Sequence, residues 1–566
     1  MPILGIDLGT TNSACAIWHR GQSLIIPNRL KNELTPSVVG IDQSGEILIG
    51  ETAKHRLISH PQDTVAVFKR YMGSEQTFSL GKRKFSSVEL SSLILRSLKE
   101  DAESYLGEPI EKAVISVPAY FNDVQRKATK QAGELAGLQV ERLINEPTAA
   151  AMTYGLQDSD QDTQFIVLDM GGGTFDVSLV EYFSGVIEVH ASAGDNFLGG
   201  EDFTQVLVNC YCDDISLDPN QLSANEKQHL YGVMDKVKHA LSNKIEVVVE
   251  KAIKQQDVSW TIDRTRFEKI TLPLLQRVQA PIEKALRDSG IKLADIDQVV
   301  LVGGATRMQT FRSLVSKMFR RMPSGNINPD LVVAMGTAIQ AGLKEKNADL
   351  DDIVLTDVCP YSLGVGIHNE ADAGNQGNRF LPIIERNTVV PVSIERSLQT
   401  VEKNQTEIRL TIFQGESRLV KNNIYLGELN IKVPKNDAGK ETITVRYSYD
   451  MNGLLEVDVT VDSTGKTHNK TIINSPTALS EKEIIASRKK LEGLKFHPRD
   501  SEENRHLIAR AERLYESSLE NKREYIGNLL TEFDRVIETQ HFEDIKKESD
   551  NLKEVLDQLE QDDIFV

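Results

Sequence analysis

The sequence predicts a multidomain protein that combines an α/β block, an antiparallel β block and a C-terminal helical block. The chain has 566 residues, which is too long for a single hydrophobic core. Short β-rich runs alternate with helix-periodic runs over the first 350 residues, and the pattern changes near residues 358 and 479. We therefore expect an α/β domain at 1–350, a linker at 351–357, a β domain at 358–478 and a helical domain at 479–566.

The composition is typical of soluble globular proteins, with 40% hydrophobic and 26% charged residues. Because 65 Lys and Arg stand against 83 Asp and Glu, the net charge is −18, which disfavours nucleic acid or an anionic membrane as a main partner. The four cysteines are too scattered for a disulfide framework or a zinc site, which favours a reducing compartment. No apolar run is long enough to span a membrane, and the first strand begins at the N-terminus, so we expect a cytoplasmic protein.

The α/β block contains two matched strand–turn–strand patterns. In "GIDLGTTNSACAIW" an apolar strand ends at Asp7, and a polar turn and a second strand follow. In "FIVLDMGGGTFDVSLV" the same pattern returns at Asp169, and aligning the two aspartates places Gly9 on Gly171. The repeat predicts a duplicated core around a shared cleft. We also expect strands at 113–117 and 165–169, and a helix from about Gln125 to Gly137.

The residue types in these turns predict a site for phosphate and Mg²⁺. Glycine allows backbone N–H groups to approach phosphate oxygens closely, and the hydroxyls of Thr10, Thr11 and Thr174 add hydrogen-bond donors. The two carboxylates suit Mg²⁺, which keeps most of its waters and takes few protein ligands. A third turn, in "VVLVGGATRMQT", lies between a strand and a helix, where phosphates or sugars are often bound. Taken alone, that third turn is more often structural.

The β block and the helical block are indicated by local signals. Strands alternate in "TEIRLTIFQGE" and "ETITVRYSYDMNGLLEVDVTV", and the Asn-Gly pair at 452–453 predicts a hairpin. A capping box at 480–483 predicts the first helix of the last block, and a His-Pro pair at 497–498 predicts a break. The apolar run Ile353-Val354-Leu355-Thr356 is flanked by acids, so it is either a buried strand or a segment that docks and undocks.

The three turns, in this order, resemble the phosphate-1, phosphate-2 and adenosine motifs of the actin–hexokinase–chaperone ATPase superfamily. Within it, "IDLGTTNS", "LDMGGGTFDVS", "LVGGATRM", "VPAYFND" and "INEPTAAAMTYG" resemble the DnaK-type 70-kDa heat-shock chaperone family. Length and tail are most similar to its short HscC-like branch. The resemblance implies an actin-like ATPase domain with a duplicated ribonuclease H-like fold, then an antiparallel β-sandwich that binds peptide, then a C-terminal α-helical lid.

The resemblance also implies roles for residues of the cleft. Asp7 and Asp169 would hold Mg²⁺ through water, Lys69 would position the attacking water, and Glu146 would order both. Thr174, with Asp176, would complete the γ-phosphate side; K⁺ is a further candidate ion. His239 stands where the family usually has arginine, and Ala305 where it has serine, so nucleotide affinity is expected to be weaker than is typical. The residues implied to bind ATP or ADP are Gly9, Thr10, Thr11, Asn12, Gly171, Gly172, Gly173, Thr174, Gly199, Gly200, Asp235, Lys238, His239, Ser242, Gly303, Gly304, Ala305, Arg307 and Asp330.

Two further sets of residues are implied outside the cleft. The first couples the domains and serves J-domain co-chaperones; it consists of Pro118, Arg126, Arg142, Asn145, Ile353, Val354, Leu355 and Asp357. Thr356 takes a place that is apolar in the family, which would weaken docking of the linker by about 1 kcal/mol. The second set lines the peptide groove: Val365, His368, Leu398, Val401, Ile408 and Leu410. His368 and Val401 replace the usual residues over the peptide, and core packing is the alternative for Ile408 and Leu410.

The function implied is that of an ATP-dependent chaperone of the stress response, in which ATP hydrolysis closes the groove and lid over extended apolar peptide segments. A dedicated client-binding regulator of the same fold, with little general refolding activity, is the alternative. A sugar kinase or an actin-like polymer shares only the cleft. The expected partners are unfolded client polypeptides, a J-domain co-chaperone and a nucleotide exchange factor, and the chain is expected to be a monomer.

Overall fold

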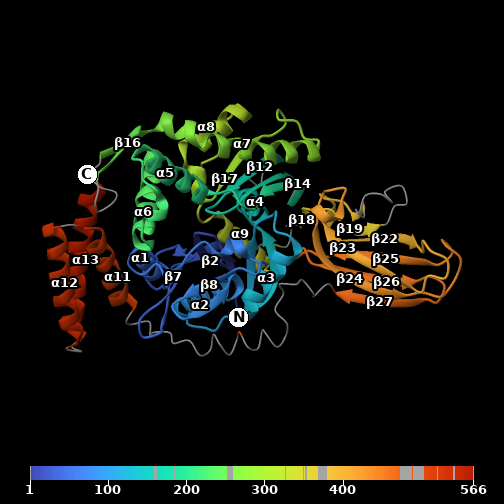
Figure 1. The fold of residues 1–566 in the computed structure, drawn as a ribbon, viewed down its shortest axis with the longest axis horizontal. Coiled ribbons are helices and arrows are strands. Elements are labelled where there is room, and N and C mark those ends of the chain that lie inside the picture. Colours follow the sequence, from blue (N-terminus) through green and yellow to red (C-terminus); the bar gives the residue numbers. More distant parts are fainter. Residues whose placement is uncertain are drawn as a thin grey trace.

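The computed structural model describes residues 2–157, 162–183, 185–250, 259–325, 327–347, 350, 354–367, 379–471, 487, 502–518, 520–538 and 542–564. A large α/β part occupies the middle, a β-sandwich lies at one end and a three-helix bundle at the other (Figure 1). Over these ranges, the structure contains no helix that is long and apolar enough to cross a membrane.

The first half of the α/β part is built on a mixed sheet with the order β11-β10-β1-β2-β3, and β4 (Thr35–Pro36) pairs with β2. β1 runs parallel to β10 and antiparallel to β2, so that Asp7 lies opposite Ala14 beside the turn of the hairpin. The expected strand at 113–117 is confirmed as β10. The main strands are β1 (Ile3–Asp7), β2 (Asn12–His19), β3 (Gln22–Ile26), β10 (Lys112–Val117) and β11 (Gln139–Asn145).

Helices and short hairpins cover this first sheet. The expected helix at 125–137 is confirmed as α3, which begins two residues earlier because Asn122 and Gln125 form a capping box. Gly137 lies beyond its end with φ +78, where glycine is favoured. The other elements are β5 (Val39–Ile41), β6 (Ile47–Ile49), α1 (Glu51–Ser59), β7 (Thr64–Val65), η1 (Phe68–Tyr71), β8 (Thr77–Leu80), β9 (Arg83–Ser86), α2 (Ser87–Leu106), α3 (Asp123–Leu135) and α4 (Glu146–Gln157).

The second half repeats this plan in a sheet with the order β17-β12-β13-β14-β18-β21. β12 runs parallel to β17 and antiparallel to β13, and Asp169 lies opposite Asp176. Both sequence-predicted hairpins are therefore present, each with an aspartate at the end of its first strand. The strands are β12 (Thr163–Met170), β13 (Phe175–Phe183), β14 (Val186–Asp195), β17 (Gln298–Val302), β18 (Val354–Val358) and β21 (Val389–Val390).

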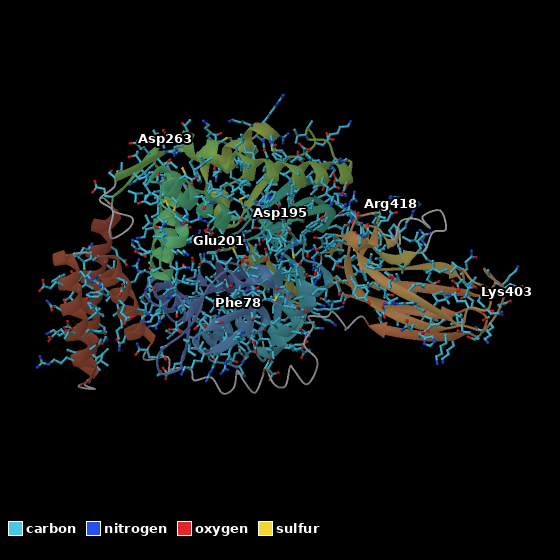
Figure 2. All side chains as sticks on the ribbon, in the orientation of Figure 1. Phe78, Asp195, Glu201, Asp263, Lys403 and Arg418 are labelled. Atoms are coloured by element: carbon cyan, nitrogen blue, oxygen red, sulfur yellow. The ribbon has the colours of Figure 1, made fainter. Side chains whose placement is uncertain are left out.

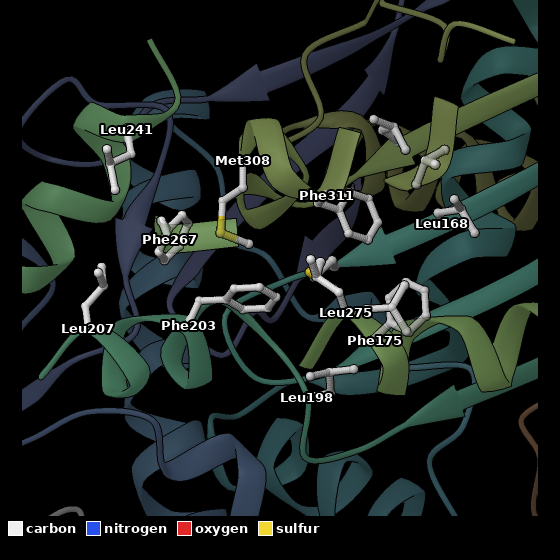
Figure 3. Close-up of a cluster of buried hydrophobic side chains, with 14 of the residues drawn as sticks. Leu168, Phe175, Leu198, Phe203, Leu207, Leu241, Phe267, Leu275, Met308 and Phe311 are labelled. Carbon is white, nitrogen blue, oxygen red and sulfur yellow. The ribbon is translucent and has the colours of Figure 1, made fainter. Parts of the chain in front are cut away.

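An aromatic core lies beneath the second sheet. Phe175 packs against Phe311 and Phe203 against Phe267, with Met308 between the two groups (Figure 3). The elements around it are α5 (Gly200–Asp214), η2 (Pro219–Gln221), α6 (Ala224–Leu241), β15 (Glu246–Glu250), β16 (Ser259–Asp263), α7 (Arg264–Ser289), η3 (Gly304–Arg307), α8 (Gln309–Phe319) and α9 (Val332–Lys344).

The β-sandwich consists of two four-stranded sheets with the orders β20-β19-β23-β24 and β22-β25-β26-β27. Side chains from both sheets, such as Ile412 and Val457, share one buried core. The hairpin expected at 452–453 is confirmed between β25 and β26. The strands are β19 (Leu363–Ile367), β20 (Arg379–Ile384), β22 (Val392–Gln399), β23 (Glu407–Gln414), β24 (Ile424–Lys432), β25 (Thr442–Tyr449), β26 (Leu455–Val461) and β27 (Lys466–Thr471), with a 3-10 turn η6 (Val420–Asn422) before β24.

The C-terminal bundle consists of α11 (Glu502–Ser517), α12 (Glu520–Glu538) and α13 (Phe542–Ile564). It has a small core of its own, to which Leu507, Phe533 and Leu552 contribute. α11 lies against α1 of the α/β part (Figure 1). The capping box at 480–483 and the break at 497–498 lie outside the described residues.

α9 joins the two halves of the α/β part because it packs against β1 and β2 on one side and α4 on the other. A Cβ atom added at Gly336 would lie 1.8 Å from the carbonyl oxygen of Ala149 in α4. We predict that Gly336→Ala lowers stability by about 2–3 kcal/mol, because a rigid backbone blocks the new methyl group. Urea unfolding of the full chain measures the midpoint.

The matched control is Gly232→Ala in α6, where the nearest atom to the added Cβ is 3.8 Å away. That substitution should raise stability by up to about 1 kcal/mol, since alanine favours the helix over glycine. Equal midpoints for the two variants would contradict the prediction.

Candidate nucleotide site

The three sequence-predicted turns line one cavity between the two halves of the α/β part. Three predicted residues, Gly173, Asp176 and Gly199, do not line it. Six residues that were not predicted do: Leu34, Glu201, Val302, Met308, Pro329 and Val333. The predicted residues brought together at the cavity are Asp7, Gly9, Thr10, Thr11, Asn12, Lys69, Glu146, Asp169, Gly171, Gly172, Thr174, Gly200, Asp235, Lys238, His239, Ser242, Gly303, Gly304, Ala305, Arg307 and Asp330.

The glycines of the turns are required by close packing. A Cβ at Gly9 would lie 1.9 Å from the carbonyl oxygen of Asn12, and a Cβ at Gly172 would lie 1.8 Å from Oγ1 of Thr11. A Cβ at Gly199 would lie 2.4 Å from the backbone of Gly172. Gly199 therefore lets α5 approach the second turn, which explains its place behind the cavity wall.

Carboxylates gather around a buried lysine in the middle of the cavity. Nζ of Lys69, on η1, lies 2.7 Å from Oε1 of Glu146, at the start of α4, and both side chains are buried. Ser116 donates a hydrogen bond of 2.8 Å to Oδ1 of Asp7. Desolvation and the charge of Glu146 raise the pKa of Asp7 to about 7, and the same two causes raise the pKa of Asp169 well above its ordinary value.

The carboxylates of this cluster fit a hydrated divalent cation. Asp7, Glu146 and Asp169 line the cavity together, and the charge of Lys69 offsets only part of theirs. The raised pKa values show that three carboxylates repel one another in a desolvated space. A Mg²⁺ ion with its waters would relieve that repulsion, and carboxylate oxygens are the ligands it prefers.

Arg70 is a residue whose role the sequence did not reveal. In the sequence, Arg70 next to Lys69 is typical of a pair of solvated surface charges, but in the structure the side chain of Arg70 is mostly buried. Its Nε donates to the carbonyl of Gly173 at 3.0 Å, its Nη2 donates to the carbonyl of Gly172 at 3.3 Å, and its guanidinium pairs with Asp202. Arg70 thus ties η1 in the first half to the second turn and to α5.

The opposite end of the cavity carries the residues expected around a nucleoside. Lys238 donates to Asp235 at 2.7 Å and to the carbonyl of Gly200 at 3.1 Å. Although burial opposes it, hydrogen bonds from His239 and Lys238 hold the pKa of Asp235 below its ordinary value. The side chain of His239 is 68% exposed, so its ring is free to stack on a base.

A sequence model described as "Hsp70 protein" matches residues 3–84 and 75–565. The chain belongs to the Hsp70 family. Curated relatives named "Chaperone protein DnaK" from Thermotoga neapolitana, Thermotoga petrophila and Thermotoga maritima are each 40% identical to it over 497 residues. The matched region covers 85% of this chain and 82% of each relative. Similarity to the HscC-like branch stays a prediction.

In this Hsp70 protein, hydrogen bonds join four of the residues expected to couple the domains: Pro118, Arg126, Asn145 and Asp357. Oδ2 of Asp357 accepts from Nδ2 of Asn145 at 2.8 Å and from Oγ1 of Thr148 at 3.0 Å. Asn145 in turn accepts from Nη2 of Arg126 at 2.6 Å. Burial raises the pKa of Asp357, although Arg126 and Arg142 act in the opposite direction. Pro118 joins the set through Phe121, whose N–H bonds to it and whose carbonyl accepts from Arg126.

The linker forms strand β18, between β14 and the short β21 in the second sheet. Val354 lies opposite Val186 and Leu355 opposite Ile187, in parallel register with β14. Val354 remains 53% exposed, whereas Asp357 and Val358 at the other end of the strand are buried, so β18 is buried at one end only. Residue 353 lies outside the described range.

The β-sandwich touches the α/β part at sites that the sequence did not indicate. Oδ1 of Asn452, in the β25–β26 hairpin, accepts from the N–H of Leu143, and Asp123 accepts from the N–H of Leu455. On the other side, Arg386 donates two hydrogen bonds to Asp288 of α7, at 2.7 and 2.9 Å. The Asn452-Gly453 turn, which the sequence indicated only as a hairpin, is thus also an interdomain contact.

The residues predicted for a peptide groove differ in exposure. Val365 and Leu410 are buried in the core of the sandwich, and Leu398 and Ile408 pack partly against that core. Val401 is 53% exposed, two residues before Lys403, which lies at the far end of the sandwich (Figure 2). Residue 368 is outside the described residues, and the groove stays a prediction.

We predict that Arg70→Lys lowers kcat for ATP hydrolysis by about tenfold or more, because one charged hydrogen-bonding group to the second turn is worth about 1.5–3 kcal/mol. A lysine cannot reach both carbonyls and Asp202 at once. Steady-state ATPase assays would give kcat and KM separately.

Arg29→Lys is the control, because Arg29 also pairs with an aspartate, Asp101, at 3.1 Å, yet does not line the cavity. It should lower thermal stability without changing kcat. If both variants lose the same activity, the positioning role of Arg70 is wrong.

Proposed function

We propose that the cavity binds ATP with Mg²⁺, with the triphosphate between the two hairpin turns, and that its hydrolysis controls a peptide groove in the β-sandwich. Family membership and the chaperone relatives make this chain an ATP-dependent chaperone and an ATPase. The observation that carries the residue assignment is the convergence of Asp7, Asp169 and the Lys69–Glu146 pair in one cavity.

The chain's own residues act mainly by positioning. Backbone N–H groups of the glycine turns and the hydroxyls of Thr10, Thr11 and Thr174 bind the phosphates. Asp7 and Asp169 would hold Mg²⁺ through water, and the bound ion supplies charge neutralisation at the phosphate oxygens. Glu146 fixes the ammonium of Lys69, which orients the attacking water. K⁺ is proposed as a second ion from the family resemblance alone.

The domain boundaries are proposed at 1–350, 351–357, 358–478 and 479–566. The repeated strand–Asp–turn–strand hairpins support an actin-like, duplicated ribonuclease H-like ATPase domain. The separate cores of the sandwich and the bundle support their assignment as substrate domain and lid. β21 nevertheless pairs with β18, so part of the proposed substrate domain extends the ATPase sheet.

The contacts of β18 and α11 support a docked state in which ATP holds both the sandwich and the lid against the ATPase domain. Hydrolysis would release β18 and α11 and close the groove over an extended apolar segment.

The proposed partners are client polypeptides, a J-domain co-chaperone and an exchange factor, with a cytoplasmic monomer as the working form. Arg142, Asn145 and Asp357 are buried, which favours their action through domain coupling rather than as the contact surface itself. General refolding of a denatured enzyme would separate this function from that of a dedicated client-binding regulator.

We predict that Lys69→Ala lowers single-turnover ATP hydrolysis by about 100-fold or more, since the water loses its positioned cation. Nucleotide affinity, measured with a fluorescent ATP analogue, should change far less. Lys99→Ala is the control, because Lys99 pairs with Glu103 at 2.6 Å in α2, away from the cavity. Full turnover by Lys69→Ala would refute the assignment.

Thr356 carries a buried hydroxyl that has no hydrogen-bond partner among the described residues. Thr356→Val removes this unsatisfied group with little change of shape and should favour the docked linker by about 1 kcal/mol. Thr148→Val should have the opposite effect, since it removes a donor from Asp357. Hydrogen exchange of residues 354–358 with ATP bound would show slower exchange for the first variant and faster exchange for the second; the same direction for both would contradict the prediction.

A further inference from the structure

Two histidines meet where the helical bundle docks on the ATPase domain. His55 of α1 and His506 of α11 place their ring centroids 5.1 Å apart, at an interplanar angle of 44°. His55 is 9% exposed and His506 is half-buried. One ion pair beside them, between Arg56 and Glu512 at 3.7 Å, also spans the two helices. The histidine pair therefore lies within the docking contact.

The carboxylates near the two histidines are already paired with other cations, so a protonated histidine would find no unshared carboxylate among the described residues. On α13, Asp557 and Glu560 already pair with Arg510, and Glu560 also pairs with Arg513. Glu51 lies 3.8 Å from Nε2 of His55 and is shared with Lys54. The charged groups that act on the two rings are Glu51 and Lys54 from α1, Arg510 and Arg513 from α11, and Glu560 from α13. Around these lie the Arg56–Glu512 pair, Asp557 beside Arg510, and Lys236 of α6 near Glu560.

The two rings resist protonation while the helices are in contact. Burial, then Arg513 and then His506 lower the pKa of His55 well below its ordinary value. Burial also lowers the pKa of His506, with Arg510 and Arg513 acting in the same direction and Glu51 opposing them. Once α11 leaves α1, both rings enter water and regain a pKa of about 6.5.

We propose that His55 and His506 form an acid-sensitive latch that holds the helical bundle on the ATPase domain at neutral pH and releases it on acidification. The docked state binds fewer protons than the released state, so docking is unaffected well above pH 6.5 and weakens as the pH falls below it. The released-to-docked ratio should rise by up to about tenfold per pH unit for each histidine. This property goes beyond nucleotide hydrolysis, since it depends on the α1–α11 contact alone.

The test measures lid docking by energy transfer in the full chain. Fluorophores are placed on Lys82→Cys, in the exposed β8–β9 turn, and on Glu532→Cys, on the exposed side of α12. The half-buried Cys210 is replaced by serine in this background. Transfer is recorded between about pH 7.5 and about pH 5.5, in saturating ATP and in ADP, so that nucleotide-driven and proton-driven changes are separated.

The original chain should show high transfer in ATP at the upper pH and a loss of transfer at the lower pH. His55→Gln with His506→Gln should remove most of the pH dependence, whereas His19→Gln, on an exposed end of β2, should leave it unchanged. His506→Arg, which is permanently charged, should release the bundle even at the upper pH. An unchanged pH dependence in the double variant, or no docking in the original chain at the upper pH, would overturn the proposal.

Discussion

The rest of this structure depends on buried carboxylates near the ends of two equivalent strands, because the surrounding groups must compensate their charge. Asp7 ends β1 and Asp169 is the last residue but one of β12, and the fold brings both into one desolvated cavity with Glu146. Such charges are costly to bury unless cations and hydrogen-bond donors surround them. Lys69, Ser116 and the glycine turns supply part of what is needed. In the proposed function, a hydrated cation with a phosphate ligand would supply the remainder, so nucleotide binding and the contact of the two halves would stabilise one another.

The linker also contains a buried carboxylate that needs hydrogen-bond donors around it. Asp357 is satisfied only when β18 lies on the sheet, because its partners Asn145 and Thr148 belong to the ATPase domain. Asn145 ends β11, and the next residue is Glu146 of the cavity. The same Arg126 that bonds Asn145 also bonds the carbonyls of Ala119 and Phe121, on either side of Tyr120, whose N–H donates to Asp176. In the proposed function, the linker strand would be the two-state element, and these hydrogen bonds connect it to Asp176 on β13, beside the cavity.

Sequence reasoning succeeded where local chemistry decides the outcome. Apolar strands that end in aspartate and enter glycine turns allow few alternatives, which is why both hairpins were found from the sequence, while the family resemblance supplied most of the other cavity residues. It failed where partners are distant in the chain: Arg70 reaches carbonyls about one hundred residues away, and Asn452 reaches across to Leu143. Alternation along β23 predicts one buried face, but it does not distinguish a core residue from a groove residue, so both interpretations stayed open for Leu410, which lies in the core of the sandwich.

In the proposed docked state, each moving part has an apolar core of its own. The bundle retains Leu507, Phe533 and Leu552 when it leaves α1, and the sandwich retains its own core when β18 leaves β14. Undocking would expose ion pairs, histidines and a short strand, together with apolar side chains such as Leu355 and Val124 that pack across the contacts. Polar contacts of this size contribute a few kcal/mol at most, which is the range that one nucleotide, or one or two protons, can shift. Nucleotides and protons can therefore shift how the domains dock on one another while each domain stays folded.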